Sequence, residues 1–303
     1  MARFKQIGER LRAYRLGSGL TADQLAAEIG VSRAAVYRIE AGEVVKIDTL
    51  ERMATLLETS TASLLGAGVE YYSNPISFFE RMRQLEAEAD QIISHFPPVS
   101  FLLMSKSYRL HLAQMLRESM PADLSPSPKL SGEIEALLDI LDERKSAWQR
   151  RRLSVVNLIT LPEIERFLQL GLIGRFDLPA EEVLRRRILA RAEVENVIQI
   201  LTDEPMGTQI GLVADTVPNI SFQLFRNQNQ TALAISPYRL GEQPNIRIGI
   251  AMVTAAEEPV RLYERLAEDL WKRARKGSHA ILALEALLKR FDLETKEKLR
   301  SAS

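Results

Sequence analysis

The sequence predicts an α-rich protein of two domains, in which an all-α domain of five short helices precedes a larger mixed α+β domain. The first observation is a series of apolar residues at helical spacing, interrupted by glycines and capping residues, over residues 1–68. The second is a set of short apolar runs between Asn, Pro and Gly over residues 208–256, which is typical of strands joined by turns. The third is a length of 303 residues with 46% apolar residues, enough for more than one buried core. We therefore place the domains at residues 1–68 and 69–303.

Local signals mark each helix of the first domain. The first helix is expected to bury a row of apolar residues and to end at two glycines: Phe4, Ile7, Leu11, Tyr14, Gly17 and Gly19. Thr21 and Ser32 are suitable N-caps for the second and third helices, because a hydroxyl oxygen can accept a free backbone N–H of the first turn. Gly30 is expected to end the second helix. The fourth and fifth helices are expected to begin at Asp48, as a cap, and at Thr61.

The second domain combines helices with a strand region. Helices are expected over residues 75–120, with a break at Pro97-Pro98, and then over 133–150, 162–170, 179–202, 258–274 and 278–300. Prolines and serines between residues 120 and 132 predict a loop. Three or four strands are expected from the apolar runs that contain Ile210, Phe222, Leu233 and Ile246. These strands predict an antiparallel sheet covered by helices.

Composition excludes several kinds of site. The chain has no cysteine, which removes disulfides, thiolate metal sites and cysteine nucleophiles, and fits a reducing compartment. No apolar run approaches the roughly 18–20 residues that span a bilayer. The N-terminus lacks the apolar stretch of a secretory signal. We therefore expect a cytoplasmic protein without a membrane partner.

Charge is balanced over the chain but not along it. The 40 basic and 40 acidic residues give a formal net charge of zero, which by itself speaks against a nucleic-acid partner. Residues 1–40 nevertheless hold seven Lys and Arg against four Asp and Glu, an excess of three positive charges. Residues 1–40 are therefore modestly basic, residues 41–60 hold two basic and four acidic residues, and the remainder is close to neutral.

Residues 20–42 form two capped helices joined by a tight turn at Gly30. Such a pair leaves the outward face of the second helix free for a DNA major groove, which admits one α-helix. In this segment the sequence resembles the lambda-repressor-like, or XRE, helix-turn-helix family. The resemblance covers about residues 4–66 and is carried by Leu20-Thr21, Leu25-Ala26, Gly30-Val31-Ser32, Val36, Glu40-x-Gly42, Leu50 and Leu56-Leu57.

The resemblance implies a recognition helix over residues 32–40. The residues expected to face bases or phosphates are Thr21, Ser32, Arg33, Ala34, Tyr37, Arg38 and Lys46. Arg33 and Arg38 lie about 140° apart around a helix, so one is expected to read guanine and the other to contact phosphate. Arg33 is the expected base reader, because the N-terminal part of a recognition helix approaches the bases most closely. Tyr37 could pack either on the sugar-phosphate chain or on the second helix, and Ala22 stands where many members of the family carry Gln.

The resemblance also implies an internal ion pair and a dimer. Arg15 and Glu40 match a family pair that fixes the first helix against the third. The small positive excess predicts weak DNA binding by one copy, because few phosphates are neutralised. We therefore expect a homodimer on a pseudo-palindromic double-stranded DNA operator.

No catalytic motif is found in the second domain. The patterns G-x-x-x-x-G-K-[ST], G-x-G-x-x-G, G-x-S-x-G and H-E-x-x-H are absent, and His95, His111 and His279 lack metal-ligand spacing. We expect no enzyme activity, no cofactor and no metal. The arginine cluster Arg185-Arg186-Arg187 with Arg191 could be an anion or DNA patch. The favoured expectation is that Arg185, Arg186 and Arg191 form ion pairs one helical turn from Glu181, Glu182 and Glu195. Residues 150–152 are less well paired, and a phosphate or acidic-ligand role stays open for them.

Three hypotheses remain for the second domain. In the first it senses an effector and dimerises, with a pocket between the strands of 208–256 and the helices lined by Phe222, Phe225, Tyr238 and Trp271. In the second it is a scaffold for dimerisation or a protein partner, as in prophage-type repressors or large antitoxins. In the third it is an unrecognised enzyme fused to its own regulator. Its length of more than two hundred residues favours sensing, because a bare dimerisation device needs a few dozen.

Overall fold

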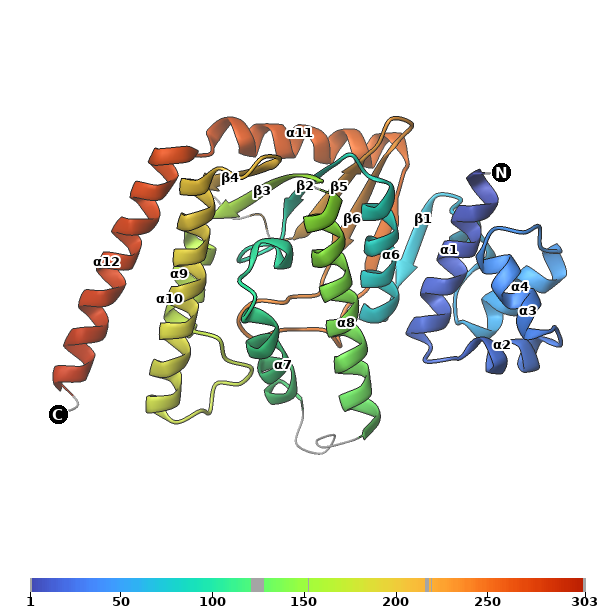
Figure 1. The fold of residues 1–303 in the computed structure, drawn as a ribbon, viewed down its shortest axis with the longest axis horizontal. Coiled ribbons are helices and arrows are strands. Elements are labelled where there is room, and N and C mark those ends of the chain that lie inside the picture. The colour runs from blue at the N-terminus through green and yellow to red at the C-terminus, as the bar shows by residue number, and fades with distance from the viewer. Residues whose placement is uncertain (1, 121–127, 152, 216–217, 219, 302–303) are drawn as a thin grey trace.

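The computed structural model describes residues 2–120, 128–151, 153–215, 218 and 220–301. Its N-terminal part, which we call the head, consists of five short helices. They are α1 (Ala2–Gly17), α2 (Ala22–Ile29), α3 (Arg33–Glu40), α4 (Ile47–Leu56) and α5 (Thr61–Leu65). From Val69 onward the chain forms a second part, which we call the body. The head lies at one end of the molecule and the last helix of the body at the other (Figure 1).

The predicted caps of α2 and α3 are present. The Thr21 hydroxyl accepts a hydrogen bond from the backbone N–H of Gln24, and the Gln24 side chain accepts one from the backbone N–H of Thr21. The Ser32 hydroxyl accepts a hydrogen bond from the backbone N–H of Ala35. Gly30 ends α2 with a φ of 69°, in the left-handed region that glycine adopts at low cost. The predicted cap of α4 was wrong. Asp48 lies inside the first turn, where its negative charge faces the positive helix end, and Lys46 holds the cap position.

The body is built on one seven-stranded sheet with the order β1-β7-β6-β5-β2-β3-β4. The strands are β1 (Val69–Tyr72), β2 (Gln91–His95), β3 (Ser154–Thr160), β4 (Thr208–Val213), β5 (Ser221–Arg226), β6 (Thr231–Ser236) and β7 (Ala251–Thr254). The helices are α6 (Pro75–Glu88), α7 (Tyr108–Glu118), α8 (Pro128–Arg151), α9 (Leu161–Leu170), α10 (Ala180–Asp203), α11 (Glu257–Arg273) and α12 (Gly277–Ser301), with a 3-10 turn at Phe101–Leu103. The predicted class, a five-helix domain followed by a mixed α and β domain, is confirmed.

The predicted direction of the strands was wrong for half of the sheet. Strands β2, β3 and β4 are parallel, whereas β1, β7, β6, β5 and β2 pair antiparallel. Strand β2 lies inside the stretch expected to be helical, and β3 was not predicted at all. Both are short and mostly buried, so they lack the alternation that reveals a half-exposed strand. Helices connect β2 to β3 and β3 to β4, which is how parallel neighbours are joined.

Two other sequence predictions differ from the structure. The apolar run around Ile246 is not a strand: Ile248 and Ile250 are exposed, and β7 begins only at Ala251. Gly249, with a φ of 143° and packed against Pro237, separates this run from the strand. Of the predicted loop at 120–132, residues 121–127 lie outside the described residues, and residues 128–132 form the start of α8.

Helices cover the two faces of the sheet unequally. One face packs against α6, α8, α9, α10 and α12 in the larger core, which includes Phe79, Leu138 and Val194. The other face packs against α11, which crosses the sheet (Figure 1) and buries Leu158, Phe222 and Leu233 under Val260, Ala267 and Leu270. No helix among the described residues is long and apolar enough to cross a membrane.

The head is attached to the body by a buried seam between α1, α6 and β1. Tyr14 stacks on Tyr72 with ring centroids 4.7 Å apart, and its hydroxyl donates to the Tyr71 carbonyl at 2.7 Å. Glu70 accepts from Arg10 at 2.5 Å, from Arg81 at 2.9 Å and from the Tyr72 hydroxyl at 2.6 Å. All these side chains except Tyr71 are buried. The seam therefore fixes the orientation of the head on the body.

Candidate functional site

The crossing of α2 and α3 determines which face of α3 is free. Leu25 and Ala26 of α2 pack in the core of the head together with Val36 and Ile39 of α3. In α3 these two residues are the buried ones. The predicted interface residues of this helix are therefore all on its exposed side: Ser32, Arg33, Ala34, Tyr37 and Arg38.

Arg33 is held in place by two neighbours although it is exposed. Its Nη1 lies 3.2 Å from Oδ2 of Asp23, and its Nη2 donates to the Tyr37 hydroxyl at 3.3 Å. The guanidinium carbon lies 5.4 Å from the centroid of the Tyr37 ring, within the range of a cation–π contact. Tyr37 thus packs on Arg33, one turn away, and its side chain remains 48% exposed. The role of Asp23 was not predicted, because no local sequence pattern links an acid on α2 to an arginine on α3.

The other predicted interface residues surround this pair. Arg38 points away from Arg33 and lies 3.5 Å from the Glu43 carboxylate, with 62% of its side chain exposed. Lys46 is exposed at the start of α4. The Thr21 hydroxyl serves as the cap of α2. Two apolar residues near Lys46 are also exposed, Val44 in the loop after α3 and Ile47 at the start of α4, and neither was predicted from the sequence.

The Arg15–Glu40 pair lies behind the recognition helix. Nε of Arg15 is 2.6 Å from Oε1 of Glu40, Nη2 is 3.0 Å from Oε2, and Nη1 donates to the Leu20 carbonyl at 2.9 Å. Less than a tenth of either side chain is exposed. This fork-shaped pair ties the C-terminal end of α3 to α1, which is itself packed on the body.

The four residues expected to line an effector pocket do not converge. Phe222 faces α11 and packs against Tyr263, with ring centroids 5.1 Å apart. Phe225 and Tyr238 lie in the core on the other side of the sheet. Residues 222 and 225 are three positions apart on one strand and so face opposite sides. Of the four, Trp271 borders a cavity, at the outer edge of β4.

The arginine clusters are engaged in internal contacts. Arg186 is buried and binds Glu182, Glu118 and the Leu172 carbonyl. Arg191 binds Glu195 and Asp292. Arg185 pairs with Glu182 and not with the predicted Glu181, because residues three apart also share a helix face.

Of the basic residues 150–152, Arg151 contributes to the fold. Arg151 donates to three carbonyls at the end of α6, those of Glu86, Ala87 and Ala89, and so closes that helix. Arg150 is exposed, and Arg152 lies outside the described residues. Within the described part of the chain, no group of three or more His, Asp or Glu side chains is placed to hold a metal ion.

Comparison with known proteins agrees with the geometry of the head. A family model of helix-turn-helix domains matches residues 6–65. The head is therefore a helix-turn-helix domain of the XRE-like type, a class of domain that binds DNA. No curated protein matches the chain. Among solved structures, the archaeal chromatin protein TrmBL2, described as showing a novel mode of DNA binding, is similar over 88% of this chain and 92% of its own. That likeness has 12% identity and a TM-score of 0.31.

Proposed function

We propose that this protein is a sequence-specific transcriptional regulator that binds a pseudo-palindromic operator as a homodimer and responds to an effector bound by its body. The observation that carries the proposal is the exposed face of α3, on which Arg33 is aligned by Asp23 and Tyr37. An arginine aligned in this way suits the O6 and N7 acceptors of guanine in the major groove.

The contacts divide into base reading and phosphate binding. Arg33 lies in the first turn of α3, the part of a recognition helix that approaches base edges most closely. Arg38 lies about 140° around the helix from Arg33, where it is expected to contact a DNA phosphate. Lys46, exposed at the start of α4, is the second expected phosphate contact. Ser32 and Ala34 complete the surface that faces the groove.

The seam supports a dimeric mode of binding. One head offers few cations to DNA, so two heads are needed for tight and specific binding. Because buried contacts hold the head on the body, two bodies that associate would set the spacing and direction of both recognition helices. We assign dimerisation and effector sensing to the body and no catalytic role. The cavity at the edge of β4 supports the sensing role.

Operator selection tests this function. Full-length protein would be used to select binding sites from random double-stranded DNA, and its mass in solution and on the selected DNA would be measured by sedimentation. The proposal predicts an inverted repeat with half-sites about one helical turn apart, bound by two copies. Selection of a single unrepeated site by one copy, or no enrichment of any sequence, would contradict it.

A further inference from the structure

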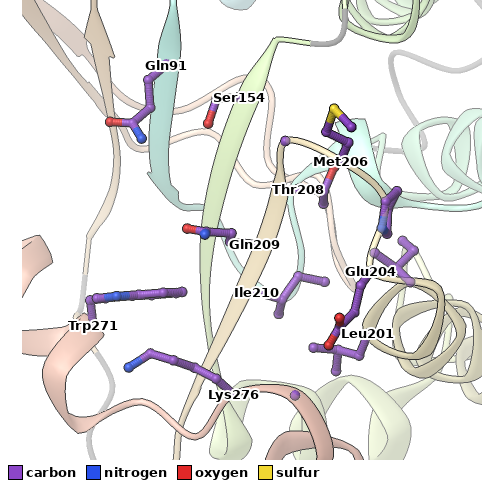
Figure 2. A pocket seen from close by; sticks show the side chains of 14 residues that line it. Gln91, Ser154, Leu201, Glu204, Met206, Thr208, Gln209, Ile210, Trp271 and Lys276 are labelled. Atoms are coloured by element: carbon purple, nitrogen blue, oxygen red, sulfur yellow. The ribbon is translucent and has the colours of Figure 1, made fainter.

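A cavity of about 510 Å³ lies along the outer edge of β4, where α10 ends and α12 begins (Figure 2). Its lining comes from four separate parts of the chain: Gln91 of β2, Ser154 of β3, residues 200–210, and residues 271–277. The volume falls within the range of small-molecule sites in proteins, about 300–1,000 Å³. The cavity is therefore large enough for a ligand the size of a nucleoside.

The flat wall of the cavity is the indole of Trp271. The Cε3 and Cζ3 carbons of the ring abut Gly211 of β4, where a Cβ atom would come within 2.9 Å of both, so glycine is needed to admit the ring. On one face the Lys276 ammonium lies 4.5 Å from the ring centroid. Figure 2 shows Lys276 on one side of the ring and Gln209 on the other. Lys276 thus covers one face of the indole, and the other face is on the side of Gln209.

Those polar side chains share one face of the sheet. Gln91 pairs with Ser154 across β2 and β3, and Gln209 pairs with Val156, two residues farther along β3, so all three residues point to the side of α11. Each carboxamide offers a donor and an acceptor next to each other. The Gln91 carbonyl oxygen accepts from Arg226 at 3.3 Å, which leaves its NH₂ group for a ligand. Gln209 is exposed at the cavity wall.

The charges of the cavity are balanced. Glu204 and Lys276 are its two charged lining residues, one acid and one base. Lys276 is placed against the covered face of the indole. The free side of the ring therefore lies next to Gln209, in a cavity that Gln91 and Ser154 also line, which favours an uncharged planar ligand with hydrogen-bonding groups on its rim.

We propose that this cavity binds a nucleobase or nucleoside, stacked on the free face of Trp271 and paired through its edge with Gln209 and Gln91. Bases stack on aromatic side chains, and glutamine carboxamides match an adjacent donor and acceptor on a base edge. Gln91 follows α6 by three residues, and α6 packs on α1 of the head. In this part the inference rests on the proposed function, in which the nucleoside would be the effector of a DNA-binding regulator.

Trp271 provides the readout. The chain has two tryptophans, so W148F leaves Trp271 as the sole indole reporter. Full-length W148F would be titrated with adenosine, guanosine, cytidine and uridine, with ribose as the control without a base. We expect saturable quenching of Trp271 fluorescence by at least one nucleoside and none by ribose. The variant Q209L in the W148F background is expected to weaken binding of that nucleoside about tenfold or more. The matched control Q114L, at an exposed glutamine of α7, should leave it unchanged.

The outcomes separate the site from the regulatory role. Failure of all four nucleosides to quench, or equal affinity of the Q209L and Q114L variants, would overturn the proposal. The binding measurement contains no DNA, so its failure leaves operator binding by the head untouched. If a nucleoside binds, operator affinity would be measured with and without it. A change in operator affinity supports the role of the nucleoside as effector. An unchanged operator affinity overturns that role but leaves the binding site supported.

Discussion

Asp23 in the first turn of α2 lies 3.2 Å from Arg33 at the start of α3, measured from Oδ2 of the carboxylate to Nη1 of the guanidinium. Tyr37 contacts the same guanidinium with its hydroxyl and its ring. An exposed arginine normally samples many rotamers, and ordering it on binding costs free energy. The two contacts reduce this cost by holding Arg33 on the outer side of the helix before DNA arrives.

Replacing Arg33 tests the predicted base reader. Arg33→Ala is expected to cost about 1–3 kcal/mol of operator binding and to relax the preference at one base pair of each half-site, because the lost contact is specific to guanine. Mobility-shift titrations against the selected operator and its single-base variants would measure both effects. Unchanged binding to the operator would show that α3 is placed differently on the DNA.

Replacing Asp23 separates affinity from specificity. Asp23→Asn removes a negative charge from the DNA-facing side, and this reduces repulsion of the DNA phosphates. The substitution also weakens the ion pair that positions Arg33. We therefore expect affinity for random DNA to stay equal or rise and the ratio of specific to random binding to fall. Glu28→Gln, at an exposed acid of the same helix, is the matched control and should leave that ratio unchanged. Equal ratios in the two variants would show that Asp23 does not position Arg33.

Lys46 is expected to act on all sequences alike. Lys46→Ala should weaken binding to the operator and to random DNA by a similar factor, because one phosphate contact is lost. For the same reason the magnitude of the slope of log affinity against log salt concentration should fall by about one. Fluorescence anisotropy titrations at several salt concentrations would give the slopes. Lys106→Ala, at an exposed lysine of the body, serves as the control. A loss limited to the operator would assign Lys46 to base reading.

The buried seam predicts a stability change that depends on pH. Burial raises the pKa of Glu70, but the charges of Arg81 and Arg10 outweigh burial and hold it below its ordinary value of 4.5. Glu70→Gln leaves buried Arg10 without its anion and Arg81 with only the more distant Glu9, at 3.8 Å. The substitution should therefore lower the free energy of unfolding by about 3–5 kcal/mol near neutral pH. Urea unfolding of both proteins at a series of pH values would measure the difference.

The sign follows from the lowered pKa. A carboxylate whose pKa is lower in the folded protein adds stability that is complete above the ordinary value of 4.5 and is lost as the pH falls through the folded value. The difference between wild type and Glu70→Gln should therefore be constant near neutral pH and shrink below about pH 4.5. A difference that grows toward acid pH would contradict the proposed role of Glu70.

How far the sequence predicts the site differs between head and body. In the head, Gly30 and Ser32 indicate the turn between α2 and α3. The spacing of the apolar residues Val36 and Ile39 then predicts the buried face of α3, and so its exposed face. The contact of Asp23 with Arg33 was not predicted, because it depends on how closely α2 and α3 cross. In the body, four aromatic residues were predicted to line one pocket. Packing places Phe222 and Phe225 on opposite sides of the sheet and leaves Trp271 at a cavity.

The helix-turn-helix and its residues could be recognised from the chain alone, because caps, glycine turns and apolar spacing act between residues close in sequence. Strands β2 and β3 could not, because both of their faces are buried and the alternation that marks a strand is absent. The same holds for the seam around Glu70 and for the cavity at Trp271. Both join residues far apart in the chain, and only the packing of the whole sheet and its helices brings them together.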